Sequence, residues 1–255
     1  MLIVSDVHGA FTELARVGRS QQPLLVLGDL INYVDYRTGE GIAADVYGRK
    51  FAQEFTRNRR RGDWSANRLL WRRVQQGRER EMAERIRSEV RRQYQGARRA
   101  LSREGRTYLI HGNVDWPGEM GEALSDVDVV VMADGRVVEI EGYSVGFAGG
   151  GVPTPARAKG EEPHEVMAEK LAGLGEVDIL CTHVAPSVGP LHRDVVTGRT
   201  ERSSQAVLEY LLTHRPRFHY FGDIHQPQAT TWRVGKTLCR NVGYFRATAR
   251  AVQHK

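Results

Sequence analysis

The sequence lacks the long apolar runs and the cysteine pairs that mark membrane-spanning or disulfide-stabilised proteins. No stretch approaches the roughly 18 to 20 apolar residues that a membrane span needs, so we expect no membrane partner. Cys181 and Cys239 are the only cysteines, which excludes a disulfide framework and favours a reducing compartment. A strand-like run begins at Leu2, so we expect no signal peptide. These absences predict a cytoplasmic protein.

Proline is scarce, and glycine is not concentrated in any repeat. The 255 residues contain 9 Pro and 27 Gly, and the glycines lie scattered among short apolar runs. That distribution is typical of many turns between strands and excludes low-complexity or repeat architectures. With 40% hydrophobic residues, the chain can bury a full core. We therefore expect one catalytic-sized domain over residues 1–255.

Positive charge is concentrated in residues 49–106, called the basic segment below. This segment holds 19 Lys and Arg against seven acidic residues, a net charge of +12, while the rest of the chain carries −6. Two interpretations stay open, a surface for phosphate-bearing partners such as nucleic acid and a solvated Arg-rich helix face. Few aromatic residues, among them Trp64, Trp71 and Tyr94, interleave these arginines, which is weak support for base stacking.

Apolar runs that end in Gly, Asp, Asn or His predict buried strands. These runs are Leu2–Ser5, Leu24–Leu27, Thr107–Ile110, Val127–Met132, Val177–Thr182 and Phe218–Phe221. Alternating, glycine-containing stretches predict antiparallel hairpins that join the sheets, at Val137–Phe147 and Thr230–Val242. Helical patterns cover Phe11–Val17, Glu165–Leu171 and Ser203–His214. The predicted fold class is therefore α/β.

The basic segment itself carries a helical pattern. Apolar residues recur at steps of four and three, which places them on one side of a long helix: Met82, Ile86, Val90, Tyr94, Ala97 and Leu101. Gly62 and Asp63 supply stop and cap signals before a second helix around residues 69–74. We interpret residues 40–105 as an Arg-rich helical insertion carried on the core.

Polar side chains follow the predicted strands at the points where the strands end. They are Asp6, His8, Asp29, Asn113, His183, Asp223 and His225. Each alone is more often a turn or a hydrogen-bonded structural residue. Loops at the carboxyl ends of parallel strands converge on one crevice, and carboxylate, imidazole and amide ligands together suit Mn, Fe or Zn. The number of ligands fits two divalent ions with one bridging carboxylate.

Five ordered blocks in the chain resemble those of the calcineurin-like metallophosphoesterase superfamily. They read Asp6-Val7-His8, Gly28-Asp29, Gly112-Asn113-Val114-Asp115, Thr182-His183 and Gly222-Asp223-Ile224-His225. Asn241-Val242-Gly243 also resembles the Asn-x-Gly that follows the last block. The resemblance runs from residue 3 to about residue 245, and the helical insertion lies outside it.

That resemblance implies a four-layer αββα sandwich of two mixed sheets and a hydrolase with a dinuclear metal site. Asp6, His8 and His225 would hold one ion, Asn113, His183 and Asp223 would hold the other, and Asp29 would bridge them. A metal-bridging hydroxide would attack phosphorus, with Asp29, Asn113 and His183 the catalytic ligands. Asp115 and Asn241 would orient the ligand loops from outside the ligand set.

Two blocks depart from the superfamily's pattern. Val114 stands where a His usually protonates the leaving oxygen, and the loss of a general acid typically costs about 10²–10⁴ in rate. His111 and His192 are candidate substitute acids. Asp223 stands where a second His is usual. The extra carboxylate favours Mn over Fe or Zn and phosphodiesters over monoesters.

The sequence therefore predicts a manganese-dependent phosphodiesterase that hydrolyses a nucleotide or a nucleic-acid derivative. Two alternatives remain open at this stage. One is a catalytically weak metal-binding scaffold, to which the loss of the His at Val114 points. The other is a nucleic-acid-binding protein that uses the basic segment and whose affinity falls steeply with salt. The sequence does not reveal the oligomeric state.

Overall fold

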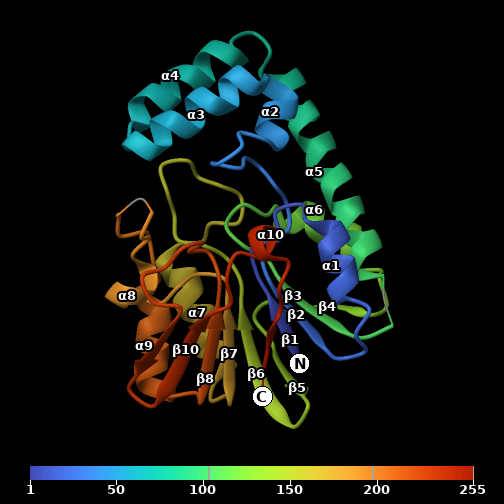
Figure 1. Cartoon of the computed structure of the whole chain (residues 1–255), viewed down its shortest axis with the longest axis vertical. Helices are drawn as coiled ribbons and strands as arrows, with labels where there is room; N and C mark the ends of the chain where they lie inside the picture. The colour runs from blue at the N-terminus through green and yellow to red at the C-terminus, as the bar shows by residue number, and fades with distance from the viewer. Residues whose placement is uncertain (103, 197, 255) are drawn as a thin grey trace.

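The computed structural model describes residues 1–102, 104–196 and 198–254. Two mixed β-sheets face one another, and helices cover their outer faces (Figure 1). The α/β sandwich expected from the sequence is therefore present. Among the described residues, no helix has the length and apolar character needed to cross a membrane.

The first sheet has five strands in the order β11-β1-β2-β3-β4. Their bounds are β1 Leu2–Val4, β2 Leu24–Leu27, β3 Thr107–Ile110, β4 Val130–Met132 and β11 Val252–Gln253. Strands β1 to β4 run parallel, and β11 pairs antiparallel with β1. The carboxyl ends of β1, β2 and β3 therefore open on the same edge.

The second sheet has six strands in the order β5-β6-β7-β8-β10-β9. Their bounds are β5 Val137–Ile140, β6 Tyr143–Ala148, β7 Ile179–Thr182, β8 Phe218–Phe221, β9 Thr231–Val234 and β10 Thr237–Asn241. Both predicted hairpins form, but the expectation that they join the two sheets is wrong. Each lies at an edge of this one sheet, because β6 and β10 pair in parallel with β7 and β8.

Helices cover the outer face of each sheet. Helices α1 Phe11–Val17, α5 Glu79–Leu101 and α6 Pro117–Leu124 pack on the first sheet, and α7 His164–Leu174 and α9 Gln205–His214 pack on the second. Two further helices are short, α8 Gly189–His192 and α10 Phe245–Thr248. Ser204 caps α9 by accepting a hydrogen bond from Val207 N.

Apolar side chains fill the space between the two sheets. Ile3, Leu25 and Leu27 of the first sheet meet Phe147 and Cys181 of the second, and all five are fully buried. Their neighbours Val4, Leu24 and Val26 face the helices instead. The strands are thus apolar on both faces, as strands buried on both sides must be.

Four helices lie within the range predicted for the insertion: α2 Ile42–Tyr47, α3 Arg49–Arg61, α4 Trp64–Gln75 and α5. The apolar stripe of α5 is buried against the first sheet's helical layer, as its spacing predicts. Helices α3 and α4 pack on one another through their own small aromatic cluster. They stand above the loops at the carboxyl ends of the strands (Figure 1). We call α2, α3 and α4 the helical cap.

Candidate metal centre

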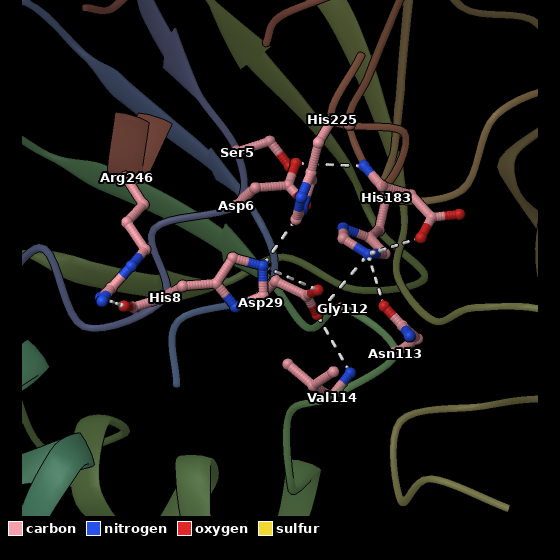
Figure 2. Close-up of polar contacts among 12 residues, drawn as sticks. Ser5, Asp6, His8, Asp29, Gly112, Asn113, Val114, His183, His225 and Arg246 are labelled. Atoms are coloured by element: carbon pink, nitrogen blue, oxygen red, sulfur yellow. Dashed lines mark hydrogen bonds and ion pairs between the residues drawn. The ribbon is translucent and has the colours of Figure 1, made fainter. Parts of the chain in front are cut away.

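The seven polar residues predicted from the sequence meet at one edge of the sandwich (Figure 2). Loops after β1, β2 and β3 of the first sheet and after β7 and β8 of the second bring them together. Four of them, Asp6, His8, Asp29 and Asp223, have positive φ angles of 58°, 41°, 54° and 66°. Non-glycine residues in this region store backbone strain, which collects at functional sites.

Backbone carbonyls set the orientation of two histidine rings. His8 Nδ1 lies 3.0 Å from Ile31 O, and His183 Nδ1 lies 2.7 Å from Leu27 O. Since a carbonyl only accepts, each Nδ1 carries a hydrogen, so each Nε2 is the atom that can bind a metal once its own proton is lost. Among the residues that the structure describes, none hydrogen-bonds the buried His8 Nε2. This is the arrangement in which proteins hold a metal-binding imidazole.

The oxygen and nitrogen atoms of the site fall into two overlapping groups. His8 Nε2 lies 3.8 Å from Asp6 Oδ1 and 3.5 Å from Asp29 Oδ2, and His225 Nε2 lies 3.2 Å from the same Asp6 oxygen. In the other group, His183 Nε2 lies 3.5 Å from Asp29 Oδ1.

Asn113 and Asp223 complete the second group. Asn113 Oδ1 lies 3.1 Å and Asp223 Oδ1 lies 3.9 Å from His183 Nε2. Asp6 with His8 and His225, and Asp6 with Asp29 and His183, each offer three ligand atoms within 4.8 Å of one another. The first group has the members of one expected ligand set, whereas the second compact group joins Asp6 and Asp29 to His183 in place of Asn113 and Asp223. Such a mixture of oxygen and imidazole donors fits divalent Mn, Fe or Zn.

Burial of several carboxylates in one place perturbs their ionisation. Burial raises the pKa of Asp223 to about 7. Burial would also raise the pKa of Asp6, but hydrogen bonds with His225 and His8 hold that pKa well below its usual range. Burial alone would lower the pKa of His183, but Asp29, Asp6 and Asp223 raise it to about 9. The clustered carboxylates therefore favour positive charge on the groups between them.

Glycines next to the ligands let neighbouring loops approach closely. A Cβ on Gly112 would clash with the Asp29 carboxylate and lie 2.5 Å from Asp29 N. A Cβ on Gly222 would clash with Asp6 and Ser5. The Gly-Asn and Gly-Asp blocks therefore need glycine for space beside the ligands.

Asp115 lies beneath the centre and is fully buried. Its carboxylate accepts hydrogen bonds from Gly112 N at 2.9 Å, from Leu30 N at 3.1 Å and from the Tyr94 hydroxyl at 3.1 Å. The same hydroxyl accepts a hydrogen bond from Trp116 N at 2.7 Å. Asp115 therefore ties the loop of Asn113 to the loop of Asp29, and Tyr94 ties both to α5.

Asn241 organises the loop that carries Asp223 and His225. Its Nδ2 donates to Gly222 O at 3.3 Å and to Ile224 O at 2.9 Å, and its Oδ1 accepts from Gly243 N at 2.8 Å. Sequence analysis gave both Asp115 and Asn241 this kind of supporting role.

Two residues that support the centre were missed by sequence analysis. The Tyr244 ring stacks on His225 with centroids 3.9 Å apart and an interplanar angle of 3°. Arg246 Nη1 donates to His8 O at 2.5 Å, and its Nε donates to Asp35 Oδ2 at 2.9 Å. Their only sequence signal is closeness to the Asn241-Val242-Gly243 block.

The structure does not support either candidate substitute acid. His111 lies among Asp134, Glu162 and Lys170, with its Nδ1 3.4 Å from Asp134 Oδ2 and its Nε2 3.3 Å from Glu162 Oε1. The Lys170 ammonium bonds to both carboxylates and so provides the cation of that cluster. His192 Nδ1 lies 3.0 Å from Glu201 O and 2.9 Å from Ser203 Oγ. Neither ring lines the cavity above the metal centre.

That cavity has a volume of about 420 Å³. Five of the predicted ligands line it together with three residues of the helical cap: His8, Asp29, Asn113, Asp223 and His225, and Phe55, Arg59 and Trp71. Val114 lines the cavity too, and its backbone N donates to Asp29 Oδ1 at 3.0 Å. The cap therefore forms part of the wall around the candidate metal centre.

Comparison with protein-family models finds no match, and no curated protein matches the chain. One crystal structure matches with a TM-score of 0.63 at 15% sequence identity, covering 96% of this chain and 90% of the other. The crystal structure of TT1561 of Thermus thermophilus matches with a TM-score of 0.52 at 12% identity, covering 98% of this chain and 96% of that one. Likeness at these identities shows a shared fold alone.

Proposed function

We propose that the chain is a two-metal phosphoesterase of the calcineurin-like metallophosphoesterase superfamily and that it hydrolyses a phosphodiester. The observation that carries this proposal is the meeting of all seven motif residues, with the Nε2 atoms of His8 and His183 facing carboxylates. Within the described residues, His8 Nε2 is buried beside carboxylates with no hydrogen-bond partner, an environment that favours positive charge there. We place the enzyme in the cytoplasm, because Cys181 and Cys239 are both buried free thiols.

The residues present fit two divalent ions. Asp6, His8 and His225 would hold one ion, and Asn113, His183 and Asp223 would hold the other. Asp29 contacts both histidine groups and would bridge the ions. When bound, such ions act as Lewis acids that activate water and neutralise charge on phosphoryl oxygens.

The chain's own side chains bind and orient the ester. Arg37, Arg59, Arg157 and Lys159 line the cavity and can pair with its negative charge. Val114, the residue after Asn113, cannot donate a proton to the leaving group. Hydrolysis should therefore be fastest for esters whose leaving group is already acidic.

With Asp223, the proposed ligand set contains three carboxylates. A set with a His at this position would contain two carboxylates, so the net positive charge of the two divalent ions with their ligands is lower here. We propose that this charge favours manganese over iron or zinc, and diester monoanions over monoester dianions. The substitution Asp223→His should then improve turnover of p-nitrophenyl phosphate more than turnover of bis-p-nitrophenyl phosphate. Equal improvement of both esters would contradict the charge argument.

The first test is metal content together with turnover of bis-p-nitrophenyl phosphate in the presence of Mn²⁺. We expect about two ions per chain and diester hydrolysis that disappears in Asp29→Asn. Asp128→Asn is the matched control, because Asp128 is exposed and remote from the cavity. Hydrolysis that survives in Asp29→Asn or proceeds without metal would refute the proposal.

A second candidate function, a metal-binding scaffold, is favoured by Val114 alone. In that case the wild-type chain would bind about two ions and leave both p-nitrophenyl esters intact. Binding of nucleic acid through the basic segment is less well supported, because five arginines of α5 already pair with carboxylates: Arg80, Arg87, Arg91, Arg92 and Arg98.

A further inference from the structure

The cavity above the metal centre is unusually rich in aromatic side chains. Phe, Trp and Tyr make up 8% of the chain, yet six of them line this one cavity: Tyr33, Tyr36, Phe55, Trp71, Trp116 and Tyr244. Its volume of about 420 Å³ falls in the range of pockets that enclose small organic ligands. A site that bound only a phosphoryl group would need neither the volume nor the rings.

Three of these six rings, Phe55, Trp71 and Tyr244, contact another ring. Trp71 packs edge-on against Phe51 and Phe55 inside the helical cap, and Tyr244 stacks on His225. In the described part of the chain, Tyr33, Tyr36 and Trp116 contact no other aromatic ring, and Trp116 packs against the hydrophobic core between the first sheet and its helices. Its ring is only partly buried. Trp116 therefore lines the cavity with a partly exposed side chain, three residues after the predicted ligand Asn113.

Cations lie around the same ring and the same cavity. Lys159 Nζ lies over the Trp116 ring, 5.9 Å from its centroid, and Arg59 lies over the Tyr36 ring at 4.9 Å. Within residues 1–102, 104–196 and 198–254, no carboxylate pairs with either side chain. An aromatic ring with a cation beside it can receive a flat group that is joined to an anion.

We propose that Trp116, Lys159 and the helical cap form a subsite for a planar aromatic group of nucleobase size, covalently joined to the phosphoryl group at the metal centre. The proposal rests on the proposed function, which supplies the place of the phosphoryl group. The aromatic group stacks on Trp116, Lys159 and Arg59 hold negative charge, and Phe55 and Trp71 close the apolar wall. The helical cap then determines which phosphoesters enter.

The experiment compares adenosine 5′-monophosphate with ribose 5-phosphate, which has the same sugar and phosphate and lacks the base. Binding of each to the Mn²⁺-loaded protein is measured by calorimetry. We expect adenosine 5′-monophosphate to bind about 5- to 150-fold more tightly, the range for one base stacked on one aromatic side chain. Trp116→Leu should abolish this difference, and Trp116→Phe should keep most of it.

The matched control is Trp232→Leu, because Trp232 is 45% exposed on β9 and does not line the cavity. Saturation-transfer NMR on the wild-type protein gives a result independent of any variant, with the strongest transfer expected at the adenine protons. Equal affinity for the two probes, a preference that persists in Trp116→Leu, or no transfer to the base would each overturn the inference.

Failure of the inference can be told apart from failure of the proposed function. If bis-p-nitrophenyl phosphate is hydrolysed while the two probes bind equally, the aromatic subsite is refuted and the phosphoesterase stands. If neither ester is hydrolysed while the base still gives tighter binding, the subsite stands and the catalytic proposal fails.

Discussion

The hydroxyl of Tyr94 links the helical insertion to the metal centre, and its removal is a quantitative test of that link. Tyr94 is fully buried in α5, 21 residues before Asp115. Its hydroxyl donates to Asp115 Oδ1 and accepts from Trp116 N. The change Tyr94→Phe deletes one oxygen and leaves the ring packing in place.

The expected cost follows from the two hydrogen bonds. A bond to a charged group contributes about 1.5–3 kcal/mol, and a buried polar group left without a partner costs about 1–3 kcal/mol. Asp115 keeps its bonds from Gly112 N and Leu30 N, so part of the loss is recovered. We expect the free energy of unfolding to fall by about 2–4 kcal/mol.

Urea unfolding of the metal-free protein measures this change, and a double-mutant cycle with Asp115→Asn isolates the coupling between the two side chains. Tyr108→Phe is the control, because the Tyr108 hydroxyl has no hydrogen-bond partner among the described residues. A loss below about 0.5 kcal/mol, the level of an ordinary surface substitution, would refute the reasoning.

Three further predictions follow from the same region. The pKa of His183 is raised to about 9, so metal binding at pH 7.5 should release a proton. Metal affinity should then rise up to about tenfold per pH unit toward pH 9. Calorimetry in buffers of different ionisation enthalpy measures the proton release, and its absence would contradict this prediction. A Cβ at residue 112 would clash with Asp29, so Gly112→Ala should lower the metal content well below that of wild type. An unchanged metal content, measured by elemental analysis, would show that the loop shifts to accommodate the Cβ. Burial lowers the pKa of His219 to about 3, so its neutral ring stabilises the fold above the unfolded pKa of about 6.5, and that stability is lost as pH falls from 6.5 toward 3. Between pH 7 and pH 5, His219→Gln should therefore lose about 2 kcal/mol less stability than wild type in urea unfolding, and equal losses would show that His219 does not titrate as described.

The secondary structure was predictable where burial leaves a strong local pattern. Strands buried on both faces are continuous apolar runs, so β2, β3 and β8 coincide with their predicted ranges. The stripe on α5 was visible because one face alone is buried. Helix α6 was missed, since its eight residues include two glycines and its Pro117 start signal was not used.

The members of the candidate site were predictable from the sequence, but the contacts that surround them were not. Its seven residues stand directly after strands, where sequence order and parallel pairing imply convergence. The supporting roles of Tyr244 and Arg246 depend on a ring stack and on a hydrogen bond that spans 238 residues. No local pattern encodes contacts of that range.

The sequence alone therefore determined the α/β class, the strand ends that carry the polar residues, and the amphipathic helix of the insertion. Each of these depends on the spacing of residues close in the chain. Only the tertiary structure decided that both hairpins lie in one sheet, that His111 is held by Asp134, Glu162 and Lys170, and that Arg59 and Trp71 line the cavity of His8 and Asp223. The physical reason is that these arrangements result from packing between segments far apart in the chain, which the local spacing of residues does not encode.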